Sequence, residues 1–525
     1  MQLPTSSAER ESCPQGTRPD GPRPQGAVWL LRGAVALGLL TTVYFFSWWG
    51  DGGRVTSPLL ALLLVCAALY HWSQLLSSWV IYLAAGRRRR TDGCGPLPAT
   101  VDVFVTAYRE PIEMLERTLR AAVAMRGAHR TWLLDDGDEL RLRALAQRVG
   151  AGYLTRHGNA DAKAGNLNAA LQRSEGEIVV VFDADHAPCE DFLERTLHRF
   201  ADPQVGFVQV MLSFANRGAG WFSRAAADSS SDFFNPTSIG MDALGSATLI
   251  GTNALIRRRA LESIGGYRPG LAEDLATSMA LHAEGWESVY VAEPLAPGLA
   301  PGGARAWAVQ QLKWARGVFE VMLCDYFRLW PRLRWGQRFA YGVRTTYYWI
   351  GMVSLLHIIF TAAVLLGGER VARVDLTQYL IHLLPLTLSA FGIRLAALRV
   401  WRHHSVPVTA QWKALVLVHS SWPLYAWAWV MALIRVPLGF RLTPKSTVPR
   451  ETPWAWTAAQ VGGVLLLAAA AVVGRDGAYP ILALFAAIQA WPAVECLRQI
   501  LRERWRRPAA SPAPLTLGEA SAAER

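Results

Sequence analysis

Long apolar runs near both ends of the sequence constrain this chain more than any other feature. Two come early, at about residues 28–49 and 58–85, and four come late, at about 347–366, 376–398, 454–473 and 479–497. Each is close to the roughly 20 residues that a helix needs to cross a bilayer. We therefore expect six transmembrane helices, two before and four after a long stretch, residues 91–340, that has no clear span.

Basic residues predict how these helices are oriented. The formal net charge is +12, and basic clusters follow apolar runs at residues 86–90, 399–404 and 502–507. This is the positive-inside pattern, in which Lys and Arg remain on the cytosolic side. We assign the positive charge to membrane orientation and expect no nucleic acid as a partner. Residues 91–340 are then cytosolic, in a multi-pass protein of the inner (plasma) membrane.

A further apolar run, Trp412–Ile434, is ambiguous because basic residues lie on both sides of it. Arg399 and Arg402 precede the run, and Arg435 follows it. If the run crossed the membrane, the last basic cluster would lie outside, against the positive-inside pattern. We prefer an interfacial or re-entrant segment, with a spanning helix as the alternative.

The predicted domain organisation follows from these runs. Both ends of the chain are rich in residues typical of disorder. The predicted segments are a disordered cytoplasmic tail (1–26), two transmembrane helices (27–86), a cytosolic domain (91–340), two transmembrane helices (345–400), an interfacial segment with a loop (405–452), two transmembrane helices (453–500) and a disordered tail (501–525).

Strand and helix patterns alternate within residues 91–340. Strands are predicted at TVDVFVTAY (100–108), TWLLDDGD (131–138) and EIVVVFDAD (177–185), and helices at EMLERTLRAAVAM (113–125) and NLNAALQR (166–173). This alternation predicts a mostly parallel α/β sheet. Ligands of such sheets bind beyond the carboxyl ends of the strands, and two of the predicted strands end in acidic residues.

The strand at 178–182 ends in two carboxylates, Asp183 and Asp185. In an extended segment residues i and i+2 point to the same side. The pair is then a hard oxygen site suited to Mg²⁺ or Mn²⁺. A solvated loop end would explain a lone pair of acids as well, so the prediction depends on other features of this region.

Three further groups support a site for a phosphate-bearing ligand. Lys163 and Gly165 are predicted just before a helix, whose free N–H groups favour phosphate. Glu273 and Asp274 begin an amphipathic helix, a position that the helix dipole alone also favours. The third group lies at i, i+3 and i+4 on one face of a helix at 306–317; it comprises Gln310, Lys313 and Trp314. Gln and Lys can hold phosphate oxygens and Trp can stack on a sugar, but a membrane-surface helix has the same pattern.

In this order and spacing the motifs resemble the processive family-2 glycosyltransferases of the cellulose synthase type. The matching motifs are DDG (135–137), DAD (183–185), AED (272–274), QQLKW (310–314) and FRLTPK (440–445). The resemblance covers roughly residues 30–500. It implies an α/β GT-A domain, Rossmann-like and binding a nucleotide sugar, inserted in an α-helical transmembrane bundle.

The resemblance also implies the roles of individual residues. Asp185 and Asp183 hold the metal, Mg²⁺ or Mn²⁺. Asp274 is the general base, with Glu273 beside it, and Trp314 holds the acceptor sugar. The implied nucleotide-binding residues are Thr106, Tyr108, Asp136, Lys163, Asp183, Gln310 and Lys313. The implied gating loop contains Phe440, Thr443 and Lys445.

The activity that the resemblance implies is a processive, inverting β-glycosyl transfer from a UDP-sugar. UDP-glucose would give a cellulose-like β-glucan, exported through the protein's own transmembrane channel. The implied partners are the UDP-sugar, the growing polysaccharide, the bilayer and accessory export subunits. Ala272 and Lys313 replace the family's Thr and Arg, and the segment at 249–261 also departs from its pattern. An N-acetylglucosamine polymer, another β linkage, a non-processive lipid glycosyltransferase and a transporter therefore remain alternatives.

Overall fold

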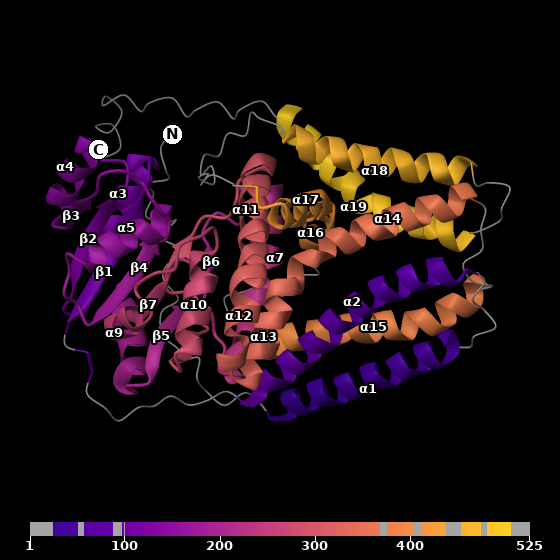
Figure 1. Ribbon diagram of the computed structural model, residues 1–525, viewed down its shortest axis with the longest axis horizontal. Helices are drawn as coiled ribbons and strands as arrows, with labels where there is room; N and C mark the ends of the chain where they lie inside the picture. The colour runs from indigo at the N-terminus through magenta and orange to yellow at the C-terminus, as the bar shows by residue number, and fades with distance from the viewer. Residues whose placement is uncertain are drawn as a thin grey trace, which may run out of the picture.

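The structure, a computed structural model, describes residues 25–50, 57–87, 97–98, 100–367, 375–403, 411–436, 453–473 and 480–505. It contains an α/β domain and a bundle of long helices, with shorter helices between them (Figure 1). The predicted gating loop and most of both predicted tails lie outside the described residues.

A seven-stranded sheet forms the centre of the α/β domain. Its order is β3-β2-β1-β4-β7-β5-β8, and within it β7 runs antiparallel to both neighbours. The predicted, mostly parallel sheet is therefore confirmed. The strands are β1 (Val101–Ala107), β2 (Arg130–Asp135), β3 (Gly152–Thr155), β4 (Ile178–Asp183), β5 (Val205–Val210), β7 (Ala254–Arg257) and β8 (Glu287–Val291). A second small sheet pairs β6 (Ser213–Phe214) with β9 (Pro297–Gly298).

Both faces of the large sheet are covered, which is why its strands are apolar without alternation. Val103 and Val180 contact one apolar cluster, and Phe104 and Val181 contact another on the opposite face. Helices α3 and α4 contribute to the first cluster, and α5 and α9 to the second. The helices of this domain are α3 (Ile112–Val123), α4 (Leu140–Val149), α5 (Ala162–Leu171), α6 (Phe192–Thr196), α9 (Arg258–Ser263) and α10 (Glu273–Ala283).

The bundle contains α1 (Gln25–Trp49), α2 (Pro58–Ala84), α14 (Ile350–Gly367), α15 (Leu376–Trp401), α18 (Trp454–Val473) and α19 (Pro480–Trp505). Five helical stretches in the described residues are long and apolar enough to cross a membrane: Gly26–Trp49, Leu60–Arg87, Trp335–Leu366, Leu376–Trp401 and Trp454–Val472. The third starts earlier than predicted because α13 (Trp335–Thr346) and η7 (Tyr347–Trp349) continue into α14. The sixth predicted span lies on α19, which is not among the five.

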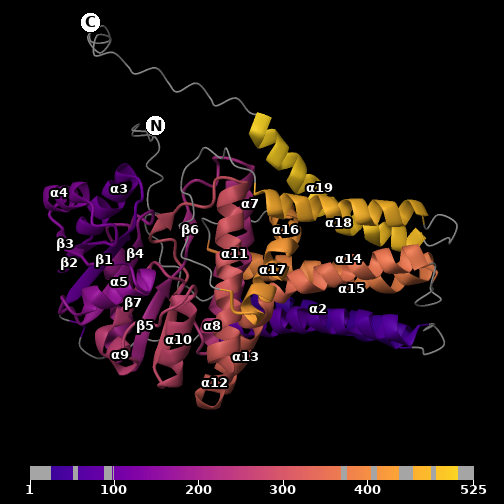
Figure 2. The same cartoon turned by 45° about the horizontal axis from the view of Figure 1, so that its top comes forward.

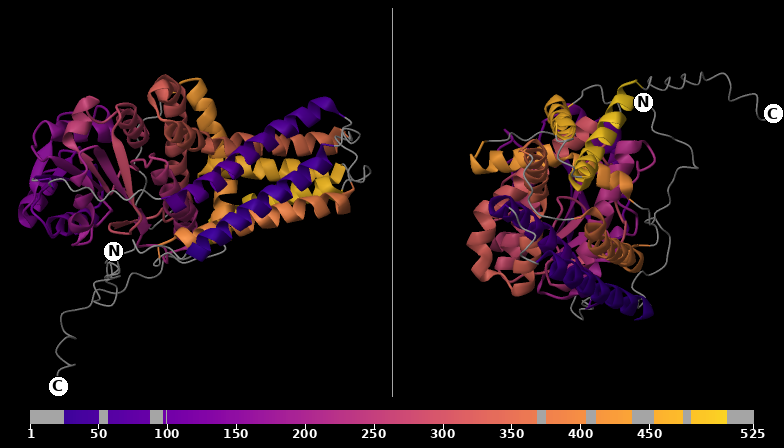
Figure 3. Two further views of the ribbon diagram at one scale, coloured as in Figure 1. Left: turned by 90° about the horizontal axis from the view of Figure 1, so that it is seen from below. Right: turned by 90° about the vertical axis from the view of Figure 1, so that its right-hand side faces the viewer.

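The bundle divides into two groups of helices (Figure 3). In one group α1, α2 and α15 share an apolar cluster that includes Leu31, Trp79 and Ile393. In the other, α14, α18 and α19 share a cluster that includes Ile358 and Leu467. Helices α2 and α14 meet where the groups adjoin.

A layer of shorter helices separates the bundle from the sheet (Figure 2). It comprises α7 (Trp221–Asp232), η4 (Phe233–Thr237), α8 (Ser238–Ala243), α11 (Ala304–Val321), α16 (Trp412–Ser420) and α17 (Trp422–Leu433). The run at 412–434 thus forms two helices of 9 and 12 residues. At about 1.5 Å per residue neither reaches across a hydrocarbon core of about 30 Å, which favours the predicted interfacial placement. The remaining short elements are η2 (Ala85–Arg87), η3 (Leu197–Ala201), η5 (Met322–Tyr326), α12 (Phe327–Leu329) and η6 (Trp330–Arg332).

Candidate active site

The carboxyl ends of β2, β1 and β4 form the edge at which the predicted acidic residues gather. Ala107 of β1 pairs with Asp135, and Thr106 pairs with Asp183. The Thr106 hydroxyl lies 3.5 Å from Asp183 Oδ1. Next to it, the backbone N–H of Tyr108 donates to Glu110 Oε2 at 2.5 Å. Both acidic motifs therefore open on the same edge of the sheet.

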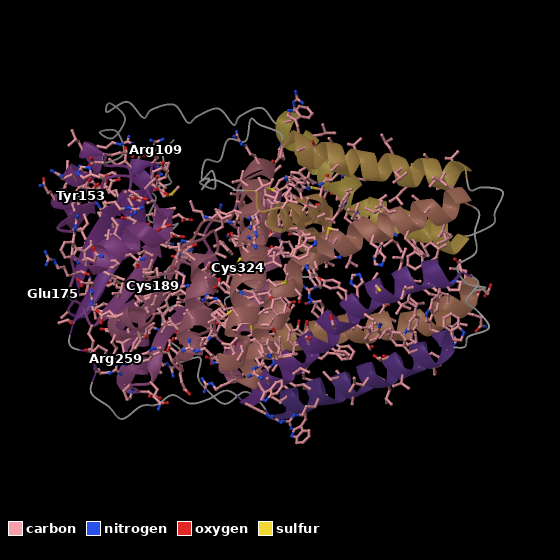
Figure 4. The ribbon with its side chains drawn as sticks, viewed as in Figure 1. Arg109, Tyr153, Glu175, Cys189, Arg259 and Cys324 are labelled. Atoms are coloured by element: carbon pink, nitrogen blue, oxygen red, sulfur yellow. The ribbon has the colours of Figure 1, made fainter. Side chains whose placement is uncertain are left out.

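The two aspartates of the DDG motif have different partners. Asp135 is fully buried and accepts hydrogen bonds from the N–H groups of Gly137 (2.8 Å) and Glu139 (2.7 Å) and from the Tyr153 hydroxyl (2.8 Å). Burial, together with the bond to Asp135, raises the pKa of Tyr153 to about 12. Tyr153 lies on the side of the domain away from the bundle (Figure 4). Asp135 therefore closes the turn and leaves Asp136 to face the neighbouring loop.

Asp136 forms a two-pronged ion pair with Arg156, a residue that the sequence analysis did not single out. Arg156 Nε lies 2.5 Å from Asp136 Oδ1, and Nη2 lies 3.0 Å from Oδ2. The same guanidinium donates to the carbonyls of Ala160 (2.7 Å) and Ala162 (2.8 Å). Asp161 and Ala162 have φ angles of 57° and 43°, in the left-handed region that costs non-glycine residues energy. Arg156 thus links Asp136 to a strained loop that leads into α5.

Helix α5 begins at Ala162, so Lys163 and Gly165 occupy its first turn. The sequence analysis was wrong to put them before the helix. A side chain at Gly165 would collide with the Ala160 carbonyl, which explains the glycine. Lys163 Nζ pairs with Asp183 and donates to the carbonyl of Gly251 at 2.5 Å. Burial lowers the pKa of Lys163, but the charges of Asp183 and Glu273 outweigh it and the net pKa is raised.

The DAD motif brings three potential metal ligands together. Strand β4 ends at Asp183, so the i, i+2 alternation on which the prediction relied does not apply to Asp185. The turn nevertheless places ligand atoms of Asp183, Asp185 and His186 within 4.8 Å of one another. The Asp183 side chain is 37% exposed and the Asp185 side chain only 1%. Burial raises the pKa of Asp183, but Lys163 more than offsets this and the net pKa is lowered, which favours the ionised ligand.

Glu273 and Asp274 lie in the first turn of α10, as predicted, and face a small pocket. Lys163, Gly251 and Tyr267 also line it. Asp274 Oδ1 accepts the N–H of Leu275 at 2.7 Å. Burial, followed by repulsion from Asp274, raises the pKa of Glu273 to about 7, and burial raises that of Asp274. A carboxylate with a raised pKa is better suited to accept a proton than an ordinary one.

Helix α11 carries the QQLKW motif between the acids and the membrane layer. Its buried Gln311 accepts a hydrogen bond from the Tyr425 hydroxyl at 3.0 Å. In the same motif Gln310 and Lys313 are half-buried, and Trp314 is 38% exposed. Burial lowers the pKa of Lys313 although Glu273 and Asp183 act to raise it. Lys163, Asp183, Glu273, Asp274 and Lys313 therefore form one electrostatic cluster.

The sheet and the position of this site are those of a GT-A-like fold. Residues 98–317 match the family described as Glycosyltransferase like family 2. Residues 262–448 match the family described as Cellulose synthase. The chain is thus similar to family-2 glycosyltransferases and to cellulose synthases over these residues, and its described part contains helices long and apolar enough to cross a membrane.

Individual relatives agree with this family. The chain is 31% identical to cellulose synthase 2 of Novacetimonas hansenii over 393 residues, 70% of this chain and 24% of the relative. It is 32% identical to the cellulose synthase catalytic subunit [UDP-forming] of Pseudomonas fluorescens over 296 residues, 54% of this chain and 40% of the relative. The chain thus spans less than half the length of these relatives.

Among solved structures, the chain is similar to a mannosyltransferase from Pyrobaculum calidifontis in complex with GDP-Man and Mn2+. The TM-score is 0.48 at 17% identity, covering 72% of this chain and 100% of the other.

Proposed function

We propose that the protein is a processive, inverting β-glycosyltransferase that polymerises UDP-glucose into a cellulose-like β-glucan and exports it through its own transmembrane channel. The observation that carries the proposal is one cluster of charges at the carboxyl edge of the sheet: Lys163, Glu273 and Asp274 line a common pocket, and Asp183 and Lys313 interact electrostatically with this group. The similarity to cellulose synthases supports the choice of reaction.

The donor would lie along the carboxyl ends of β1, β2 and β4. Asp136 and the backbone around Thr106 and Tyr108 would receive the nucleoside, because they border the same edge. Lys163 and Lys313 would face the diphosphate, with Gln310 one turn from Lys313 on α11. Their positive charges favour departure of an anionic leaving group. A divalent cation, Mg²⁺ or Mn²⁺, held by Asp185 and Asp183 would add Lewis-acid neutralisation of that charge.

Asp274 would act as the general base toward the acceptor hydroxyl. Its buried carboxylate has a raised pKa, while Lys163 and Lys313 favour the ionised form that can take a proton. Attack by the acceptor oxygen on the face opposite the nucleotide is a single displacement, so an α-linked donor gives a β-glycoside. Glu273, whose pKa lies near 7, would share the proton with Asp274 at neutral pH. Trp314, exposed on α11, would stack on the acceptor sugar.

A cavity between the two helix groups supports the export path. It has a volume of about 390 Å³ and is lined by residues of α2, α13, η7 and α14 that include Tyr70, Ser73, Thr346 and Trp349. Its size lies within the range of about 300–1,000 Å³ that is typical of small-molecule sites. Gln74 Nε2 donates to Thr346 Oγ1 at 2.9 Å and so connects the two walls. Aromatic faces and hydroxyl groups are the surfaces that a sugar chain requires.

Helix α13 would link this path to the catalytic acids. Arg344, two residues before Thr346, is the cation that acts most strongly on Asp274. The GT-A domain would lie on the cytosolic side of the plasma membrane, where UDP-sugars are made. The loop with Phe440, Thr443 and Lys445 would gate the donor site, and accessory subunits would receive the polymer.

Product analysis with purified protein in nanodiscs tests this proposal. We expect incorporation of radiolabel from UDP-glucose into polymer that a β-1,4-glucanase digests, and none in Asp274→Asn. Incorporation of label from UDP-N-acetylglucosamine would show that the donor differs from the proposed one. A glucan that resists the β-1,4-glucanase would show a different linkage. A short product that extracts with lipid would contradict processivity, and ordinary activity in Asp274→Asn would contradict the assigned base.

A further inference from the structure

We infer that Arg344 of α13 is a positioning residue for the proposed general base: its guanidinium holds the Asp274 carboxylate in the ionised form that can accept a proton. The inference rests on the proposed function, in which Asp274 takes the proton of the acceptor hydroxyl. It adds a residue that lies outside the acidic motifs and the QQLKW motif, on a helix that continues into the bundle.

The guanidinium of Arg344 is enclosed and only partly satisfied. Its Nη1 atom is buried and has no hydrogen-bond partner among the described residues. Its Cζ atom lies 4.8 Å from the centroid of the Phe233 ring, so the group is held over the face of an aromatic side chain. Buried donors are normally paired, and this N–H is therefore available to a carboxylate or to an oxygen of the acceptor.

Charged or titratable groups from the neighbouring elements surround Asp274. They are Lys163 of α5, Lys313 of α11, Arg344 of α13 and Tyr348 of η7, with Glu273 adjacent on α10 itself. Burial raises the pKa of Asp274, and Arg344 opposes this rise more strongly than either lysine does. Asp274 is in turn the carboxylate that acts most strongly on Arg344. The two side chains are therefore each other's main partners of opposite charge.

A second contact holds α13 against α10. The Tyr341 hydroxyl, one turn before Arg344, lies 2.7 Å from Nδ1 of His282 in the last turn of α10. His282 Nε2 lies 2.9 Å from the Ser288 hydroxyl of β8, and His282 and Tyr341 are both buried. Burial lowers the pKa of His282 to about 3, so this ring is neutral and adds no competing cation. The bond links the end of α10 opposite Asp274 to the helix that carries Arg344.

Helix α13 also connects the proposed base with the proposed export path. It begins the stretch Trp335–Leu366, one of the described helical stretches that are long and apolar enough to cross a membrane. Thr346 and Trp349 of this stretch line the cavity between the helix groups, and Arg344 precedes Thr346 by two residues. The same stretch therefore presents a cation to the base and a wall to the cavity.

The pH dependence of UDP release tests the inference, with the full chain in nanodiscs and saturating UDP-glucose. An opposite charge within about 4–6 Å lowers the pKa of a carboxyl group by about 1–3 pH units. In Arg344→Gln we expect the acidic limb of kcat to move to higher pH by about one pH unit or more. This is about a tenfold loss of rate on that limb, with little loss above it. Arg344→Lys keeps the charge and should restore most of the limb.

Arg338→Gln is the matched control. Arg338 lies on the same helix, but its guanidinium donates to the carbonyls of Trp330 (3.0 Å) and Pro331 (3.2 Å). This variant should leave the acidic limb in place. Thermal unfolding of each variant shows whether it is folded.

Tyr341→Phe tests the placement of α13 and keeps the inference testable if Arg344→Gln does not fold. Loss of the hydroxyl that contacts His282 should move the acidic limb in the same direction by a smaller amount. In the Arg344→Gln background it should add nothing, because two changes that act through one group are not additive.

Several outcomes would overturn the inference. They are an unchanged acidic limb in Arg344→Gln, an equal movement in Arg338→Gln, and a loss of rate in Arg344→Gln that is the same at every pH. An additive shift in the double variant would contradict the placement through Tyr341. If Asp274→Asn abolishes UDP release while Arg344→Gln keeps the limb in place, the proposed base stands without Arg344. Ordinary UDP release in Asp274→Asn would instead contradict the proposed function.

Discussion

Strands β2 and β4, which lie on either side of β1 in the same sheet, end in similar acidic motifs with different surroundings. After β2, Asp135 has three hydrogen-bond donors and Asp136 is held by Arg156, so protein groups satisfy both carboxylates. After β4, Asp183 is partly exposed beside Lys163, and Asp185 faces a histidine without hydrogen-bond partners. The comparison teaches that protein groups fix the carboxylates after β2 in position beside the proposed donor site, whereas the carboxylates after β4 are arranged to hold a cation. The predictions below test this difference, from the largest effect to the smallest.

Loss of the proposed base should have the largest effect. Asp274→Asn keeps the size of the side chain but cannot accept the acceptor's proton, and we expect glycosyl transfer to fall by about 10²–10⁴-fold. Polymer synthesis in nanodiscs measures this, with UDP binding as the control because Asp274 is not among the donor-binding residues. A decrease in activity of less than tenfold would show that another residue is the general base.

Replacing one aspartate after each of the two strands should distinguish a metal-binding carboxylate from a structural one. Asp185→Asn should reduce activity by about 100-fold through lost metal affinity, with little change in thermal stability. Asp135→Asn should instead destabilise the fold by about 1–3 kcal/mol, because a charged acceptor with three donors becomes an amide. Unfolding and synthesis are measured on both variants. A loss of stability in Asp185→Asn together with a loss of activity alone in Asp135→Asn would contradict the roles that we assign to the two aspartates.

Arg156→Lys should produce a moderate and specific effect. Lysine keeps the charge but loses the planar fork that binds Asp136 and two carbonyls at once. We expect the KM for the donor to rise about tenfold while kcat changes little, since uniform binding is lost. Hydrogen exchange at residues 157–165 should increase in parallel. A fall in kcat with an unchanged KM would contradict a role in donor binding.

The smallest expected effect is a pH dependence of stability. Ionisation of Glu273 is disfavoured in the folded state, because its pKa rises from 4.5 to about 7. Below pH 4.5 Glu273 is protonated in both the folded and the unfolded state. The free energy of unfolding therefore falls as the pH rises from 4.5 to about 7, and the contribution of Glu273 is constant above that pH.

Glu273→Gln should remove the Glu273 contribution to this slope and should unfold at a higher temperature than the wild type above pH 7, but at the same temperature near pH 4.5. Thermal unfolding in EDTA measures this difference in unfolding temperature, and Glu262→Gln, at an exposed glutamate, is the control. An unchanged slope in Glu273→Gln would assign the pH dependence to another group.

Many of the strand and helix positions could be predicted because they follow from local sequence patterns. The apolar run at 178–182 and its terminal acid predict a strand and its end, and the spacing around Glu273 predicts the start of a helix. The position of Lys163 was wrong because helix α5 begins before the apolar pattern does, at a loop that Arg156 holds.

The two residues that sequence analysis missed depend on tertiary contacts. Arg156 lies in a loop without periodicity, 20 residues from its partner Asp136. His186 had a signal, since it directly follows the acidic motif, but its burial and lack of partners are properties of the fold. The division of the bundle into two groups likewise reflects which helices share clusters, which apolar length alone does not encode.

Helix α11 is attached at two points to the layer at the membrane surface. Besides the bond between Gln311 and Tyr425, Trp307 Nε1 donates to Ser421 Oγ at 2.8 Å. Lys313 lies on the same helix, so a tilt of α17 would shift the position of Lys313 in the site. We therefore expect the thickness and stiffness of the surrounding lipid to change the rate of the proposed glycosyl transfer.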